Sequence, residues 1–113
     1  MHEYSIVAAL VDKVDAIARE RQALAVKRLH VRIGELSGVE TELLATAFRT
    51  VREKTVCEAA DLTILPVPAR WSCPDCKREI ARGEVLRCGV CGTPARLAEG
   101  DEIVLERVEM EVA

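Results

Sequence analysis

The sequence predicts a small protein of the α/β (α+β) class, in which two helices cover one face of a small three-stranded mixed sheet and a cysteine-bearing module is inserted before the last strand. Three observations support this class. Two segments place apolar residues at helical spacing, and three others alternate apolar and polar residues as strands do. Four of the five cysteines lie close together between the last two strand segments. With 113 residues, the chain has room for one compact core and one small accessory.

The first helix is expected over residues 3–20 and the first strand over residues 28–33. The helix is amphipathic, because its apolar residues recur every three or four positions: Ile6, Val7, Leu10, Val14 and Ile17. The strand alternates polar residues with Leu29, Val31 and Ile33, which predicts that one of its faces is buried. His30 belongs to the polar set and is interpreted as an outward-facing side chain without a metal role.

A second amphipathic helix is expected to begin near Thr41 and to stop near Lys54. Its apolar residues again recur at helical spacing: Leu43, Leu44, Ala47, Phe48 and Val51. Thr41 or Ser37 is the expected N-cap, because a hydroxyl oxygen can accept a hydrogen bond from an N–H group of the first turn.

The last two strands are expected over Leu62–Pro66 and Ile103–Val112. Pro66 and Pro68 lack an N–H group, so the earlier strand is expected at a sheet edge or where the chain leaves the sheet. In the later strand the alternation changes parity, and a β-bulge near Glu106 would reconcile its two halves. An exposed edge near Pro66 leaves both a monomer and a dimer open.

Charge and hydropathy exclude several classes of partner. The chain has 16 Lys and Arg against 19 Asp and Glu, interleaved along the sequence, so neither a nucleic acid nor an acidic membrane is favoured as a partner. Neither a signal peptide nor an apolar stretch of the roughly 18 residues that a membrane span needs is visible. We therefore expect a cytoplasmic protein, and a reducing compartment favours metal ligation over disulfides for closely spaced cysteines.

Two CxxC pairs, Cys73 with Cys76 and Cys88 with Cys91, are separated by eleven residues. Four thiolates from two such turns can surround one Zn²⁺ tetrahedrally, and paired CxxC motifs at this spacing are a strong zinc signal. With no open position for water, such a zinc would be structural, and the module is expected to resemble a zinc ribbon. Free or disulfide-paired thiols, an iron–sulfur cluster and a rubredoxin-like iron are the weaker alternatives.

These cysteines divide the chain into an inserted zinc-binding module, residues 71–100, and an α/β body made of residues 1–70 and 101–113. Trp71, directly before the first pair, is expected to pack on the module or at its junction with the sheet. Cys57 stands alone in sequence, and we interpret it as a small semi-buried hydrophobe rather than a nucleophile or a further metal ligand.

The N-terminus combines an α-amine at Met1, an imidazole at His2 and a carboxylate at Glu3. The amine, the amide nitrogens of His2 and Glu3 and the imidazole Nδ1 can close fused chelate rings around one ion. Four nitrogens in a plane suit Ni(II) or Cu(II), whereas zinc gains no ligand-field benefit from them. Considered alone, His2 is also explained as a solvated residue at a helix start.

Three stretches of the sequence are distinctive: an N-terminal MHEYSIV, a central VRIGELSGVETELLATAF, and CPDC with CGVC followed by a final strand. Together they resemble the HypA/HybF family over essentially the whole chain. The resemblance implies that His2 is the principal nickel ligand and that the Met1 amine and the backbone of His2 and Glu3 complete the site. It also implies that Glu3 adds an axial or outer carboxylate and that the four paired cysteines hold zinc.

The resemblance implies a nickel metallochaperone that binds Ni(II) at its N-terminus and delivers it during NiFe-hydrogenase maturation, and in some members during urease maturation. The implied partners are the GTPase HypB and the hydrogenase large subunit. Such a protein is not an enzyme, and a small enzyme that uses Cys57 or a metal-bound water is the weakest hypothesis. The alternative is a zinc-ribbon adaptor that binds a protein and has no nickel role.

Overall fold

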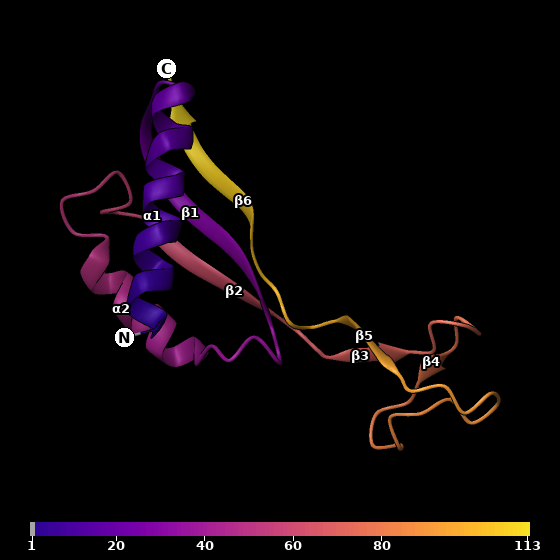
Figure 1. Cartoon of the computed structure of the whole chain (residues 1–113). Coiled ribbons are helices and arrows are strands. Elements are labelled where there is room, and N and C mark those ends of the chain that lie inside the picture. Colours follow the sequence, from indigo (N-terminus) through magenta and orange to yellow (C-terminus); the bar gives the residue numbers. More distant parts are fainter. Residues whose placement is uncertain (1) are drawn as a thin grey trace.

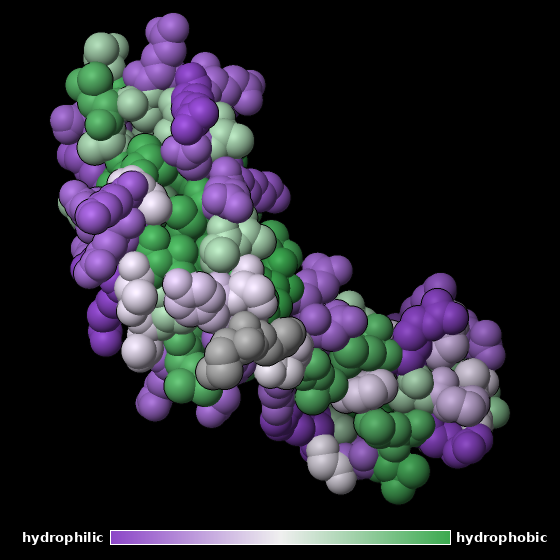
Figure 2. Space-filling model, turned by 60° about the vertical axis from the view of Figure 1, so that its left-hand side comes forward, coloured by the Kyte–Doolittle hydropathy of each residue, from purple (hydrophilic) through white to green (hydrophobic). Residues whose placement is uncertain are grey.

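The computed structural model describes the backbone of residues 2–113 and the side chains from Glu3 onward, so the interpretations of Met1 and of the His2 imidazole lie outside the described residues. The described chain is elongated, with principal extents of 56 × 29 × 16 Å. It forms a larger body that contains both helices and a smaller one at the opposite end (Figure 1). In the space-filling view the two meet at a narrow waist (Figure 2).

The larger body is built on a mixed sheet of three strands, β1 (Ala23–Gly34), β2 (Asp61–Val67) and β6 (Ile103–Val112), in the order β2-β1-β6. β1 runs parallel to β2 and antiparallel to β6. The central position of β1 explains its length and burial, since it is the only one of these strands with a neighbour on each side. The predicted three-stranded mixed sheet is confirmed, and β2, which carries Pro66, lies at its edge.

Helices α1 (His2–Glu20) and α2 (Thr41–Val51) lie on the same side of this sheet (Figure 1). One core unites them with β1, and its members are buried almost completely: Val7, Val11, Val14, Leu29, Val31, Leu44 and Phe48. These are the positions at helical or strand spacing, so burial of one face explains both patterns. Cys57 and Ala60, from the turns that follow α2, belong to the same core.

A bulge in β6 confirms the predicted irregularity. His30 pairs with Arg107, but the next residue of β1, Val31, pairs with Leu105, so Glu106 is the extra residue on the β6 side. The bulge turns Leu105 and Val108 toward the core although they are three positions apart.

Two local predictions for the second helix are wrong. Its N-cap is Glu40, whose side chain makes no capping hydrogen bond, and the Ser37 hydroxyl instead accepts a hydrogen bond from the N–H of Val39. The helix also ends at Val51 rather than near Lys54. Lys54 has a φ of 59°, in the left-handed region, and the chain continues from there in turns.

The smaller body contains a second three-stranded sheet, β4-β3-β5, made of β3 (Arg70–Ser72), β4 (Glu79–Ile80) and β5 (Arg96–Glu99). Its strands have two to four residues, too short for a period to be visible in the sequence. Ile80 and two cysteines form its small core, and Trp71 packs against them, which confirms the expectation for this side chain.

Candidate metal centres

The four cysteines of the CxxC pairs converge at the end of the smaller body. One sulfur from each of Cys73, Cys76, Cys88 and Cys91 lies within 4.8 Å of the other three. Sulfurs at about 2.3 Å from a tetrahedral zinc lie about 3.8 Å apart, so a small contraction brings all four to bonding distance. The structure thus brings together all four candidate ligands, which are 18 residues apart at their extremes.

Each pair sits on a turn with the same hydrogen bonds. In the first, the N–H of Cys73 donates to the carbonyl of Arg78 and the N–H of Lys77 donates to that of Cys73. In the second, Cys88 donates to Thr93 and Gly92 donates to Cys88. Lys77 and Gly92 occupy equivalent positions, and both have positive φ, 62° and 75°.

Backbone N–H groups inside these turns point at sulfur. The N–H of Cys76 donates to Cys73 Sγ at 3.3 Å. The N–H groups of Cys91 and Val90 lower the pKa of the Cys88 thiol to about 6. Such donors stabilise a thiolate, which is the form that binds a metal ion.

The sulfurs also form hydrogen bonds with one another, and Cys73 Sγ and Cys91 Sγ are 3.5 Å apart. A side-chain hydrogen bond with Cys91, followed by burial, raises the pKa of Cys76 to about 12. The Cys91 sulfur and the Asp75 carboxylate are both linked to the hydroxyl of Thr93, at 3.1 and 2.9 Å. In a set of thiols that are hydrogen-bonded to one another, a divalent cation can replace the protons. The donor chemistry is therefore compatible with a structural zinc.

Glu3 is the one residue of the predicted nickel site whose side chain is described. Its Oε2 accepts a hydrogen bond of 3.1 Å from the N–H of Glu40, the N-cap of α2. A carboxylate at this position satisfies a donor that the helix itself leaves unpaired. The first turn of α1 is thereby attached to the start of α2.

Two other residues singled out by sequence lie in the α/β body and not in the cysteine cluster. The Cys57 side chain is fully buried in the core of the α/β body, and burial, the largest cause, raises its pKa to about 11. His30 lies on the outer face of β1, where its Nε2 is 2.5 Å from a Glu109 carboxylate oxygen. Cys57 is therefore more buried than predicted, and His30 has a partner on the sheet.

The sequence pattern did not reveal the contacts that join the two bodies. The carboxylate of Glu35 contacts Arg82 of the smaller body, and that of Glu99 contacts Arg32 of β1. Glu35 was part of the central motif, but Glu99 belongs to none of the motifs found in the sequence.

Among the helices of the described residues, none is long and apolar enough to cross a membrane.

Comparison with known proteins agrees with this architecture. The sequence model of the family described as "Hydrogenase/urease nickel incorporation, metallochaperone, hypA" matches residues 1–110. The hydrogenase maturation factor HypA of Shewanella oneidensis is 38% identical, over 100% of this chain and 98% of that protein. The HypA of Aquifex aeolicus is 39% identical, over 99% of each chain.

Solved structures give the same result. The solution structure of the Ni metallochaperone HypA from Helicobacter pylori is similar with a TM-score of 0.73 and 30% identity, over 98% of each chain. A second solution structure, of a HypA protein, has a TM-score of 0.82 and 32% identity, over 100% of this chain and 98% of that one. The chain therefore belongs to the HypA family of hydrogenase and urease nickel-incorporation metallochaperones.

Proposed function

We propose that this protein binds Ni(II) at its N-terminus and delivers it during NiFe-hydrogenase maturation, while zinc on the four paired cysteines serves as a scaffold. The observation that carries the proposal is the match to a nickel-incorporation family over residues 1–110, which includes both the terminal His2 and the cysteine cluster. Nickel is here the cargo, and zinc is the resident ion.

The proposed nickel ligands are the Met1 amine, the amide nitrogens of His2 and Glu3, and the imidazole of His2. Helix α1 begins at His2, and the N–H groups of a first helical turn have no acceptor within their own helix. In a planar four-nitrogen site, Ni(II) can displace the amide protons of His2 and Glu3. The contact between Glu3 and the N–H of Glu40 supports this arrangement, because it holds the chelating turn against α2.

The proposed zinc ligands are Cys73, Cys76, Cys88 and Cys91. Four protein sulfurs leave no coordination position for water or substrate, so the ion would act through structure alone. The core of the smaller body consists of Ile80 and two of these cysteines, with Trp71 and Ala95 against it. So few apolar side chains cannot stabilise a fold of this size without the metal.

The two proposed metal-binding roles correspond to the two bodies. We propose residues 1–70 and 101–113 as the nickel-binding domain and residues 71–100 as the inserted zinc module. The proposed partners are the GTPase HypB and the hydrogenase large subunit, between which the protein would act as a carrier in the cytoplasm rather than as a catalyst. Hydrogenase maturation as the setting is supported by the relatives named above.

Nickel titration of two histidine variants tests the terminal site. His2→Ala should lose tight nickel binding and keep one zinc per chain, because the imidazole is a proposed nickel ligand and the proposed zinc ligands are the four cysteines. His30→Ala is the matched control, since it removes the other histidine from the outer face of the sheet, and it should bind nickel as the parent does. If folded His2→Ala bound nickel with unchanged affinity, the zinc-ribbon adaptor without a nickel role would be the better explanation.

A further inference from the structure

Glu35 joins the two bodies through three hydrogen bonds. It directly follows Gly34, the last residue of β1, and its Oε1 accepts from the N–H of Ala69 at 2.8 Å. Its carboxylate also accepts hydrogen bonds from both terminal nitrogens of Arg82 in the zinc module. Nη1 lies 3.0 Å from Oε1, and Nη2 donates to Oε2. This bidentate geometry fixes the direction of the guanidinium as well as its distance.

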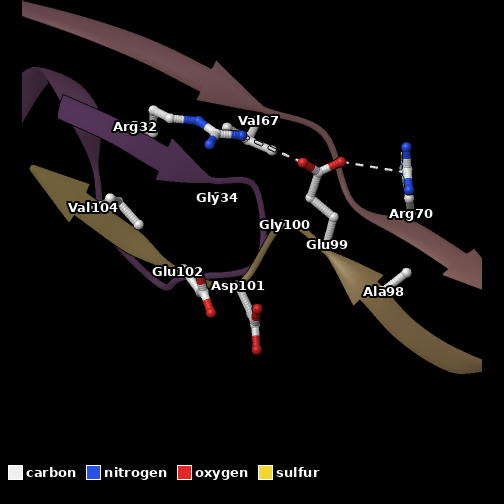
Figure 3. Close-up of a pocket in the computed structure, with 10 residues that line it drawn as sticks. All are labelled: Arg32, Gly34, Val67, Arg70, Ala98, Glu99, Gly100, Asp101, Glu102 and Val104. Atoms are coloured by element: carbon white, nitrogen blue, oxygen red, sulfur yellow. Dashed lines mark hydrogen bonds and ion pairs between the residues drawn. The ribbon is translucent and has the colours of Figure 1, made fainter. Parts of the chain in front are cut away.

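A second carboxylate bridges the same waist. In Figure 3, Glu99 lies between Arg32 and Arg70 and directs one oxygen at each of them. Both nitrogen–oxygen distances are 3.3 Å, and the residues border a cavity of about 270 Å³. Arg32 belongs to β1 of the large sheet, whereas Glu99 ends β5 of the small one, so this pair also spans the two bodies.

The covalent connection alone leaves the orientation of the module weakly determined. Two short connectors, residues 68–69 and 100–102, are all that join the two sheets along the chain (Figure 1). They cross at Gly34, where the N–H of Leu36 donates to the carbonyl of Gly100 at 2.7 Å. Backbone bonds at one point act as a pivot, and a contact away from that point is needed to select one angle. The Arg82 side chain supplies one such contact to Glu35, and Arg32 supplies another to Glu99.

The segment that carries Glu35 also reaches the N-terminal turn. Five residues after Glu35, the N–H of Glu40 donates to the side chain of Glu3 in the first turn of α1. The segment from Glu35 to Glu40 therefore contacts the module at one end and the N-terminal turn at the other. A rotation of the module that displaces Glu35 would act on the same segment that holds Glu3.

We propose that Glu35 is a positioning residue: by clamping Arg82 it holds the zinc module at one angle to the α/β body, and release of this clamp lets the module turn about the connectors. The side chains of Glu35 and Arg82 are 37% and 70% exposed, so the pair is accessible to a competing charged group of a partner. Exposed ion pairs stabilise little, so a competing group can displace this one at a small energetic cost. This inference goes beyond the nickel proposal and holds whether or not nickel binds at the terminus.

The test uses residual dipolar couplings of backbone amides in the zinc-loaded, nickel-free full chain. In the parent protein, couplings from both bodies should fit one alignment tensor. In Glu35→Gln and in Arg82→Gln, the module couplings should shrink and require a separate tensor, while those of the body remain unchanged. The double variant should show no further loss, because each single change already removes the same contact.

Arg78→Gln is the matched control, since it removes an arginine from the same module without touching Glu35. It should keep the single tensor of the parent. Arg82→Gln is not expected to unfold the protein, because it leaves all four cysteines and the backbone near Glu35 unchanged. Zinc analysis then verifies that each variant still binds one ion per chain. A single tensor in Glu35→Gln and Arg82→Gln would overturn the proposal, and so would equal loss of alignment in Arg78→Gln.

Discussion

Replacement of Gly34 by alanine tests the crossing that joins the two bodies. A Cβ atom at this position would lie 2.2 Å from the carbonyl oxygen of Gly100 and 2.6 Å from the nitrogen of Asp101. Both obstacles are backbone atoms, so a change of side-chain rotamer cannot relieve them. Non-bonded heavy atoms pack at about 3.5 Å or more, so the connector after β5 must move by roughly 1 Å.

The energetic cost follows from that movement. Overpacking that forces a backbone shift costs about 1–3 kcal/mol. The shift also stretches the 2.7 Å hydrogen bond from the N–H of Leu36 to the Gly100 carbonyl, which is worth about 1 kcal/mol. We therefore expect Gly34→Ala to lower the free energy of unfolding by about 2–4 kcal/mol, a large part of the stability of a small domain.

Alanine substitutions at two other glycines distinguish the cost of this clash from the cost of backbone strain. Gly38 has a φ of 81° and no atom within 4 Å of an added Cβ, so Gly38→Ala should cost only the left-handed conformation, about 1–2 kcal/mol. Gly89 has open space and no positive φ, so Gly89→Ala should stay within about 0.5 kcal/mol of the parent. Urea unfolding of the zinc-loaded proteins, followed by circular dichroism, measures all three. Equal stability of Gly34→Ala and Gly89→Ala would refute the reasoning.

Further predictions concern the two metals. Cys73→Ser or Cys91→Ser should lose the one zinc expected per chain and disorder residues 71–100 more than the α/β body; metal analysis of the parent that found iron, or no metal, would contradict this. Cys57→Ser should leave nickel affinity and zinc content unchanged but lower stability by about 1–3 kcal/mol, because it places a hydroxyl in the core. A large loss of nickel affinity in that variant would indicate that Cys57 belongs to the nickel site. Nickel affinity should fall between pH 8 and pH 6, because protons compete for an amine and an imidazole with reference pKa values of about 7.7–8.0 and about 6.5. Affinity that stayed flat over this range, measured by calorimetric titration, would exclude these ligands.

The long helices and strands could be predicted because burial of one face imposes a regular spacing of apolar residues along the whole element. The alternation around Leu29 and the helical spacing around Leu44 each report one buried face, and the change of parity at Glu106 reported the bulge correctly. The convergence of four cysteines could also be predicted, since two CxxC turns have few other uses at this spacing.

What the sequence left open depends on contacts between distant residues. Glu35 and Arg82 are 47 positions apart, and nothing local indicates that a turn after β1 will meet the module. The side chain of Glu3 contacts the N–H of Glu40 across 37 positions, which a reading of the terminus as a chelate alone did not anticipate. The left-handed φ of Lys54, which ends the turn after α2, is unusual for lysine and was not visible in the apolar pattern.

The most direct test of the terminal nickel site is a titration of two forms of the folded, zinc-loaded protein: one with the native Met1 terminus and one with two residues added before Met1. The extension converts the Met1 amine into an amide and breaks the fused chelate rings, while the core that begins with Ile6 and Val7 is untouched. We predict that the native form binds one nickel with the absorption spectrum of a planar four-nitrogen site, and that the extended form keeps its zinc and its thermal stability but loses tight nickel binding. Unchanged nickel affinity and an unchanged planar spectrum in the extended form would contradict the account.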